Sequence, residues 1–387
     1  MKLIAKTLYG LEKVLAEELL ELGAADVNPV NRAVIFEGDH ELLYRVNYCS
    51  ATALSVLAVV SEFNIRTPKD LYYNCSRIDW GIYADCDSTF SVSPVVKSEL
   101  FPHTGYAALV VKDAIADFFR NATGRRPSVN NTDPDLLINL HISHDKVTVS
   151  LDSSVVPLYK RGYRTETSEA PLNEVLAAGM IRLAVWRANK PLLDPMCGSG
   201  TIPIEAALAA CRIPPGKFRH TFGFTRWKDF DEDLFSRVRI KAEKRIVNSP
   251  VRISGSDISP EALSKARTNV VNAGLETVID LGVNDFANLE RNNDEGMLFI
   301  NPPYGKRIKT EEISGLYSMI GTTLKHRFSG WSAFLITSDI ESLKFVGLKP
   351  KTRKILYNGA LECLFAGYEL YEGTKKGEKP PGLSHPA

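Results

Sequence analysis

The chain has 387 residues, of which 44% are hydrophobic and 24% are charged, so it can build two or three domains with real cores and is not disordered overall. With 47 Lys and Arg against 46 Asp and Glu, its net charge is +1, which excludes a uniformly basic nucleic-acid coat but allows a local basic surface. No apolar run reaches the roughly 18–20 residues that span a bilayer, and charged residues interrupt the first twenty. We therefore expect a soluble, cytoplasmic protein without membrane association.

Cysteine and histidine patterns argue against metal and disulfide chemistry. The 6 Cys contain no CxxC pair, and the 7 His show no spacing typical of metal ligands. We expect no metal.

The first part of the chain mixes short strands and helices in an α+β rhythm. Apolar and alternating segments predict strands at 3–8, 33–36, 51–60 and 88–96 and a hairpin at 136–151. Apolar stripes and start signals predict helices at 11–22, at 40–49, from Thr67 onward, and at 104–121.

From Pro191 the pattern becomes a strict alternation of strand and helix. Strands are predicted at 192–193, 251–256, 278–283, 297–300 and 332–337, with helices near 201–211, 259–273 and 313–328. Such alternation is typical of a doubly wound, mostly parallel sheet. Two further strands at 353–357 and 361–369, joined by Asn358–Gly359, add an antiparallel hairpin and make seven strands in all.

The first of these strands ends in a motif that combines a carboxylate with a glycine turn, Leu192-Leu193-Asp194-Pro195-Met196-Cys197-Gly198-Ser199-Gly200-Thr201. The glycines allow a ligand to approach the backbone at the start of a helix. Because no Lys follows, it is not a phosphate-binding Walker loop, and the third glycine of the dinucleotide fingerprint is missing. An acidic strand end suits a ligand with a cationic amine. Gly-x-Gly alone would also fit an ordinary strand-to-helix turn.

Polar residues also follow the second and third strands. Asp257 ends the second strand, where nucleotide-type folds place a carboxylate against ribose hydroxyls. Asp285 and Phe286 follow the third, a pair suited to an adenine amine and ring. Asp285 could equally be a helix cap.

The fourth strand leads into Asn301-Pro302-Pro303-Tyr304. The prolines remove two backbone donors and fix φ, so the carbonyls are held rigid and unpaired. The Asn301 side-chain oxygen and the Pro302 carbonyl offer two acceptors to the two hydrogens of an exocyclic amine, and Tyr304 offers a stacking face for a base.

These motifs, together with KRGYR, APLNE and NGALEC, resemble the THUMP-domain rRNA guanine-N2 methyltransferases, a family of class I enzymes that use S-adenosylmethionine. The similarity covers roughly residues 1–370 and matches the amino-terminal half of the fused bacterial 23S rRNA enzyme. KDAIADFF and RRP resemble the THUMP signature. The resemblance implies a ferredoxin-like and THUMP RNA-binding region, then a Rossmann-like domain. It implies these boundaries: 1–65 ferredoxin-like, 66–155 THUMP, 156–190 linker and first helix, and 191–371 methyltransferase. The remaining stretch, 372–387, is rich in Lys, Gly and Pro and is expected to be a disordered tail.

The resemblance also implies roles for individual residues. Asp194, Gly198 and Gly200 would form the loop under the methionine part of the cofactor, with Pro195, Cys197 and Ser199 beside them. Asp257 would hold the ribose, Ile258 and Phe286 would lie against the adenine, and Asp285 would meet its amine. Asn301 and Pro302 would grip the target amine, with Pro303 next to them and Tyr304 stacked on the guanine. Tyr163, Pro171 and Leu172 would close over the cofactor. Cys197 is expected to be a small turn residue and not a nucleophile, since no general base accompanies it.

RNA would be held by local basic groups. In the THUMP-like region these are Lys112, Arg125 and Arg126. A second run, 212–228, carries Arg219 and Arg226 among Phe218, Phe222, Phe224 and Trp227, and it follows the first helix of the cofactor fold. Its cations could contact phosphates beside a flipped guanine while an aromatic ring props the gap. Its aromatics could equally be core.

The sequence therefore predicts an enzyme that transfers methyl from S-adenosylmethionine to RNA, releasing S-adenosylhomocysteine and forming N2-methylguanine. The partner would be 23S rRNA or an assembling large-subunit particle, and no protein partner is evident. A tRNA guanine-N2 methyltransferase is the nearest alternative. An adenine-N6 methyltransferase shares the Asn-Pro-Pro-Tyr motif, and a non-enzymatic RNA-binding factor is disfavoured because both motifs are intact.

Overall fold

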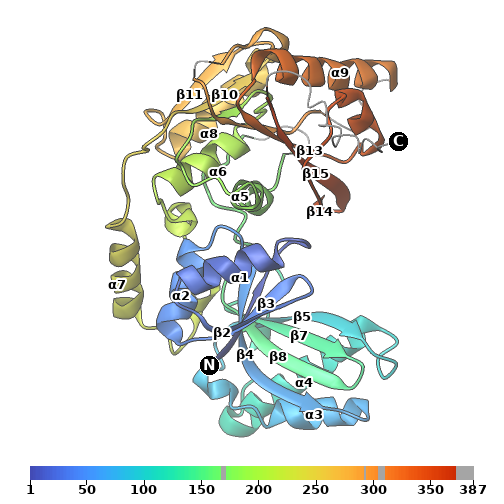
Figure 1. Ribbon diagram of the computed structural model, residues 1–387. Helices are drawn as coiled ribbons and strands as arrows, with labels where there is room; N and C mark the ends of the chain where they lie inside the picture. Colours follow the sequence, from blue (N-terminus) through green and yellow to red (C-terminus); the bar gives the residue numbers. More distant parts are fainter. Residues whose placement is uncertain (167–170, 292, 304–309, 372–387) are drawn as a thin grey trace, which may run out of the picture.

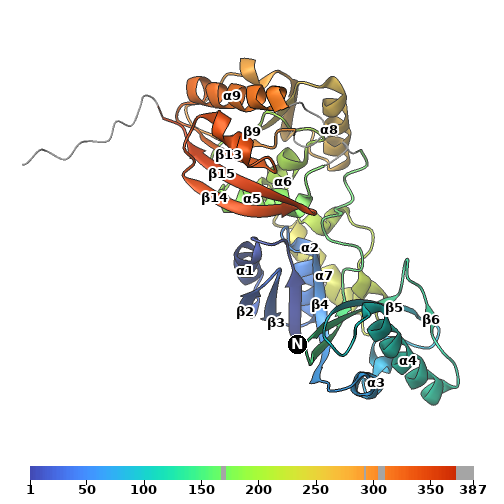
Figure 2. The same cartoon turned by 90° about the vertical axis from the view of Figure 1, so that its right-hand side faces the viewer.

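The computed structural model describes residues 1–166, 171–291, 293–303 and 310–371. Two bodies, each built on one β-sheet, follow each other along the chain and lie end to end (Figures 1 and 2). Within the described residues, no helix is both long and apolar enough to cross a membrane.

The N-terminal body is a single eight-stranded sheet in the order β2-β3-β1-β4-β8-β7-β5-β6. The regions predicted as ferredoxin-like and THUMP-like therefore share one sheet. They join where β4 pairs with β8, antiparallel and almost from end to end. The strands are β1 (Lys2–Lys6), β2 (Ala25–Val30), β3 (Ala33–Glu37), β4 (Ser55–Asn64), β5 (Thr89–Lys97), β6 (Ser128–Val129), β7 (Leu136–Ser143) and β8 (Lys146–Asp152).

Helices α1 (Glu12–Glu21), α2 (His40–Cys49) and α4 (Thr104–Thr123) pack on this sheet, and α3 (Pro68–Ser76) packs on α4. Local signals explain their ends. Thr67 and Asp70 form a reciprocal capping box at the start of α3. Gly124 ends α4 with φ +74°, a left-handed conformation that glycine adopts without strain.

The C-terminal body is a mixed seven-stranded sheet in the order β11-β10-β9-β12-β13-β15-β14. The first five strands pair in parallel, and β15 is antiparallel to both of its neighbours. The terminal hairpin predicted at Asn358–Gly359 is present, with Gly359 at φ +64°. The strands are β9 (Leu192–Asp194), β10 (Ile253–Asp257), β11 (Ile279–Val283), β12 (Met297–Ile300), β13 (Ser332–Thr337), β14 (Thr352–Asn358) and β15 (Leu361–Glu369).

Helices cover both faces of the second sheet: α5 (Glu174–Leu183), α6 (Thr201–Ala210), α8 (Pro260–Asn272) and α9 (Thr310–Arg327). The residues of β12 alternate between two apolar clusters. Phe299 belongs to the cluster of α5, α6 and α8, whereas Leu298 and Ile300 belong to the cluster of α9. Because successive strand residues face opposite sides, the helices lie on opposite faces.

Two strands and one α-helix were not predicted from the sequence: β2, β6 and α7 (Glu232–Glu243). β2 is a mostly exposed edge strand that contains Pro29, so it lacks the apolar alternation on which the prediction relied. β6 has only two residues. Helix α7 buries only Phe235 and Val238, and it packs on α2 of the N-terminal body although it follows the first strand of the C-terminal one.

The two bodies are held together by buried apolar and ionic contacts. Leu11, the N-cap residue of α1, packs with α5, where a Cβ on Gly179 would come within 2.4 Å of the Leu11 side chain. Arg161 and Glu205 form an ion pair in which both side chains are 1% exposed. The same arginine donates to the Ala51 carbonyl of the N-terminal body at 2.6 Å. Arg161 therefore links the N-terminal body, through Ala51, to helix α6 of the C-terminal body, through Glu205.

We expect Arg161→Met to destabilise the protein by about 3–5 kcal/mol, because it leaves the Glu205 carboxylate buried without its partner. The double variant Arg161→Met/Glu205→Leu should recover much of that loss. Denaturant unfolding at neutral pH measures both. Equal losses in the single and double variants would contradict the argument.

Candidate active site

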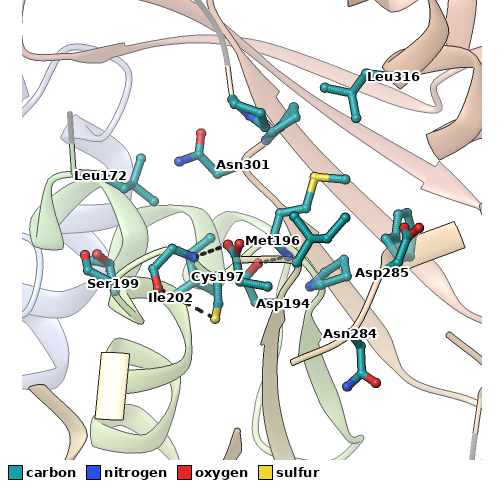
Figure 3. Close-up of a pocket in the computed structure, with 18 of the residues that line it drawn as sticks. Leu172, Asp194, Met196, Cys197, Ser199, Ile202, Asn284, Asp285, Asn301 and Leu316 are labelled. Atoms are coloured by element: carbon teal, nitrogen blue, oxygen red, sulfur yellow. Dashed lines mark hydrogen bonds between the residues drawn. The ribbon is translucent and has the colours of Figure 1, made fainter. Parts of the chain in front are cut away.

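A cavity of about 460 Å³ opens at the carboxyl ends of β9, β10 and β12. In open α/β sheets this edge is where ligands bind. Asp194, Asn301 and Asp285 lie around it (Figure 3). The residues that line it are Pro171, Leu172, Asp194, Pro195, Met196, Cys197, Gly198, Ser199, Thr201, Ile202, Asp257, Ile258, Asn284, Asp285, Phe286, Asn301, Pro302, Pro303, Leu316 and Met319.

Most residues singled out from the sequence thus meet in one cavity. Gly200 is not in its lining and serves as the N-cap of α6, with φ +86°. Tyr163 is also outside the lining: its side chain is buried and its hydroxyl donates to Glu205 at 3.0 Å. Tyr304 lies outside the described residues.

The glycine turn is tied to the neighbouring strand. The Cys197 N–H donates to the Ser256 carbonyl at 2.8 Å, and the Gly198 N–H donates to Oδ2 of Asp257 at 2.9 Å. Gly198 has φ +54°, and a Cβ there would meet no atom within 4 Å. Glycine is therefore required here for its backbone conformation. Burial raises the pKa of the Cys197 thiol well above its usual value, helped by Asp194 and Asp257. A thiol that stays protonated is a poor nucleophile.

Asp194 is a buried carboxylate, 1% exposed, that accepts one hydrogen bond from the Met196 N–H at 3.1 Å. Burial raises its pKa well above the usual value, and the charge of Asp257 adds to this. Within the described part of the chain, Asp194 forms no ion pair. Apart from the Met196 N–H, no described group stabilises an ionised carboxylate in this position, so the site suits a ligand with an ammonium group.

The other strand ends offer polar and apolar surfaces. Asp257 accepts from the backbone N–H groups of Gly198 and Ser259, at 2.9 Å each, and its oxygens keep further lone pairs for hydroxyl donors. Ile258 beside it is 69% exposed and offers apolar surface at the rim. Asp285 caps a short helix by accepting from the Ala287 N–H at 2.9 Å, so the helix-cap alternative is confirmed; its side chain also lines the cavity, and contact with an adenine amine stays a prediction.

Asn301 follows β12 directly, and its Oδ1 is buried without a hydrogen-bond partner among the described residues. A buried unpaired acceptor costs about 1–3 kcal/mol, which a protein tolerates where a ligand supplies the donor. Pro302 is buried and Pro303 is exposed. The Asn301 oxygen is therefore available to accept a hydrogen bond from a ligand donor in this cavity.

Arg164 and Asn269, whose roles the sequence did not predict, hold the glycine turn through hydrogen bonds to Ser199 and Thr201. Arg164 donates to the hydroxyls of Ser199 and Thr201, at 3.2 and 2.8 Å, and pairs with Glu174 of α5 at 2.8 Å. Asn269 of α8 is fully buried and donates to the Ser199 carbonyl at 3.0 Å. The basic run KRGYR was visible in the sequence, but these partners lie too far along the chain to be paired from it.

Arg164→Met is expected to weaken binding of S-adenosylhomocysteine, because the turn loses two side-chain donors and Glu174 loses its partner. One charge-assisted hydrogen bond is worth about 1.5–3 kcal/mol, so a loss of about tenfold or more is expected. Arg182→Met removes another arginine that pairs with carboxylates, at the domain interface, and serves as the control. Isothermal calorimetry measures both; equal effects would contradict a local role.

Each proposed RNA-binding cation has a partner within the protein. Arg125 pairs with Asp87 and Arg126 with Asp117, and both arginines remain more than half exposed. Lys112 lies 3.5 Å from Oδ1 of Asn131. These three side chains are accessible to an external anion.

Three aromatic residues of the run 212–228 are buried, and one expectation placed an aromatic of this run against the RNA. Phe222, Phe224 and Trp227 are buried in the core of the N-terminal body, with Phe224 stacked on Tyr44 at 4.5 Å. The idea that an aromatic of this run props the gap left by a flipped base is therefore wrong for these three, because they are enclosed by protein. The core interpretation is the correct one for them.

The two arginines of this run are also bound to protein. Arg219 donates to the carbonyls of Val156, Pro157 and Lys160, and burial lowers its pKa to about 10. Arg226 makes a two-pronged contact with Asp133, at 2.7 and 3.1 Å. Their main role in the structure is to join the insertion to the segments around it.

No group of three or more His, Cys, Asp and Glu side chains suited to a metal occurs in the described ranges. All six Cys are free thiols.

An open α/β sheet with a cavity at the carboxyl ends of its strands is typical of domains that bind nucleotide-like ligands. Three family models match the chain: the RlmL ferredoxin-like domain at 2–57, the THUMP domain at 66–152, and the RMKL-like methyltransferase domain at 161–366. The chain belongs to the RMKL-like methyltransferase family.

Related sequences and solved structures are similar to this chain over nearly its whole length. A protein of Synechocystis sp. provisionally named an RNA methyltransferase is 40% identical over 366 residues, 94% of this chain and 95% of that protein. The ribosomal RNA large subunit methyltransferase K/L of Psychromonas ingrahamii is 39% identical over 94% of this chain, which spans only 49% of that protein. SMU.472, provisionally named a methyltransferase and solved with S-adenosylhomocysteine, is 32% identical with a TM-score of 0.87, covering 96% and 99% of the two chains.

Proposed function

We propose that this protein transfers a methyl group from S-adenosylmethionine to the exocyclic amine of a guanine in RNA, forming N2-methylguanine in 23S rRNA. The proposal depends on Oδ1 of Asn301. This atom lies at the end of β12 in the cavity that Asp194 and Asp257 also line, and it has no hydrogen-bond partner among the described residues, so it can accept an amine hydrogen. The names of the Synechocystis and Psychromonas relatives support RNA, and the latter name supports large-subunit rRNA.

The cavity suits the cofactor in three separate ways. Asp194 would bind the methionine ammonium group, which compensates its buried charge. Asp257 would accept the ribose hydroxyls, and Ile258, Asp285 and Phe286 would surround the adenine. The solved relative SMU.472 was crystallised with S-adenosylhomocysteine, which supports the same ligand here. When bound, this cofactor supplies an electrophilic methyl group on a sulfonium.

The residues of the chain act on the amine. Its lone pair is delocalised into the guanine ring, so it is a poor nucleophile unless it is oriented. Asn301 Oδ1 and the Pro302 carbonyl would each accept one amine hydrogen, direct the lone pair, and stabilise positive charge that develops on nitrogen. No strong base is required, because the proton can pass to water after the nitrogen is alkylated. A paired target base must first leave its stack, at a cost of a few kcal/mol.

An adenine-N6 activity is the second candidate, because its amine would meet the same acceptors. A 30% identical structure from Listeria monocytogenes is named a predicted N6-adenine-specific DNA methylase. The THUMP match favours RNA over DNA, and a tRNA substrate would use the same domains.

Mass spectrometry of nucleosides from rRNA and tRNA of a deletion strain separates these candidates. Loss of N2-methylguanosine from rRNA alone supports the proposal. Loss only from tRNA, or loss of N6-methyladenosine, contradicts it. Restoring the gene on a plasmid should restore the modification, and the Asn301→Ala form should not.

A further inference from the structure

A group of two tyrosines and an arginine lies where the two bodies meet, with Tyr9 and Arg32 exposed and Tyr357 half-buried. Tyr9 follows β1, Arg32 lies between β2 and β3, and Tyr357 is in β14. The two rings contact edge to face, with centroids 5.6 Å apart, and the Arg32 guanidinium lies 5.8 Å from the Tyr357 ring centroid. Tyr9 is 46% exposed. We call these three residues the Tyr9 cluster.

The backbone around the Tyr9 cluster is well anchored. The Glu12 carboxylate accepts from the N–H groups of Gly10 and Arg32, at 2.9 and 3.1 Å. Gly10 has φ +86°, and a Cβ on it would come within 2.8 Å of the Ile355 carbonyl, so the two bodies touch closely here. The Arg32 side chain has no ion pair within the described residues. The Tyr357 hydroxyl donates to the Glu362 carboxylate at 2.7 Å, so one carboxylate adjoins the cluster. The cluster therefore presents fixed aromatic surface and a guanidinium that forms no direct ion pair among the described residues.

The Tyr9 cluster also lies on the same edge of the catalytic sheet as the cavity. β14 runs parallel to β13, because both are antiparallel to β15 between them, so β14 ends at the edge where β12 delivers Asn301. Three strand spacings of about 4.8 Å separate β12 from β14, about 14 Å in all. Asn358 next to Tyr357 accepts from the Asn173 N–H at 3.2 Å, and Leu172 beside Asn173 lines the cavity.

We propose that the Tyr9 cluster binds an unpaired nucleotide of the RNA substrate that flanks the target base, an inference that rests on the proposed function. An exposed tyrosine face accepts any base by stacking, and the free guanidinium suits the adjacent phosphate. Neither body forms the cluster alone. It therefore gives the fixed orientation of the two bodies a role in substrate binding, next to the cavity where the reaction occurs.

The test uses the full chain and a fluorescent oligoadenylate with one central guanine, with affinity measured by anisotropy. The double variant Tyr9→Leu/Tyr357→Leu should bind this RNA at least about fivefold more weakly, because a base stacked on an aromatic ring contributes at least that factor. Tyr357→Phe keeps the ring and should bind like the parent. Affinity for S-adenosylhomocysteine and the thermal midpoint should not change in any of them.

Tyr73 provides a matched control, since it is 58% exposed with Arg77 5.3 Å from its ring centroid, the same pairing on a different surface. Unchanged RNA affinity in the double variant, or an equal loss in Tyr73→Leu, overturns the inference. If the double variant loses thermal stability, Tyr9→Leu alone decides the matter, because Tyr9 lies in an exposed loop.

The inference and the proposed function fail differently. A parent protein that neither binds nor methylates RNA overturns the proposed function. A double variant that methylates RNA with an unchanged KM overturns the Tyr9 cluster only. If the cluster is correct, KM for RNA rises while kcat remains close to that of the parent.

Discussion

Replacing Asn301 with alanine is expected to reduce turnover by about 10²–10³, the usual effect of losing one hydrogen bond that strengthens in the transition state. Affinity for S-adenosylhomocysteine should change much less, since the side chain is assigned to the substrate amine. Single-turnover kinetics with saturating RNA measures the first, and calorimetry measures the second. Near-normal turnover would remove Asn301 from this role.

Asn301→Ala is expected not to lower the stability of the free protein. Because Oδ1 of Asn301 is buried without a hydrogen-bond partner, removing it should leave the free protein at least as stable as the parent. Ser199→Ala is a suitable comparison, because the Ser199 hydroxyl accepts from Arg164 at 3.2 Å and its loss should lower the thermal midpoint. An Asn301→Ala protein that is clearly less stable would show that the side chain has a structural role instead.

Asp194→Asn is expected to change cofactor affinity and stability in opposite directions. Loss of the charge should weaken binding of S-adenosylhomocysteine by about 10- to 100-fold, the worth of a charge-assisted hydrogen bond to the ammonium group. The free protein should become more stable at neutral pH, because the variant no longer holds a buried carboxylate without a cation. Calorimetry and thermal unfolding of the same preparation measure both.

The pH dependence follows from the raised pKa of Asp194 in the folded protein. Since the unfolded chain has the lower, ordinary carboxyl pKa, the folded state binds more protons between the two values, and the stability of the free protein falls as pH rises through this range. Cofactor affinity should rise over the same range, because the ammonium group favours the ionised carboxylate. In Asp194→Asn both trends should flatten; if they remain, another group causes them.

The sequence by itself determined the local features, because these depend on neighbouring residues. The helix start at Thr67, the turn at Asn358–Gly359 and the alternating pattern after Pro191 all appear in the structure where they were predicted. The strand ends were also sufficient to find the cavity. Asp194, Asp257 and Asn301 come together because parallel strands present their carboxyl ends at one edge.

Only the tertiary structure decided which distant segments would pair. The eight-stranded sheet forms because β4 pairs with β8, and no local sequence pattern predicts that pairing. Asn269 accepts from the Thr165 N–H over a separation of 104 positions. The run 212–228 has the composition of an RNA-binding surface, yet its aromatics are buried and Arg219 binds carbonyls. The charge and aromatic content of a segment limit which partners it can bind. Which partner it does bind depends on the packing of the whole chain, because burial and hydrogen bonding involve contacts between residues far apart in the sequence, and local periodicity carries no information about those contacts.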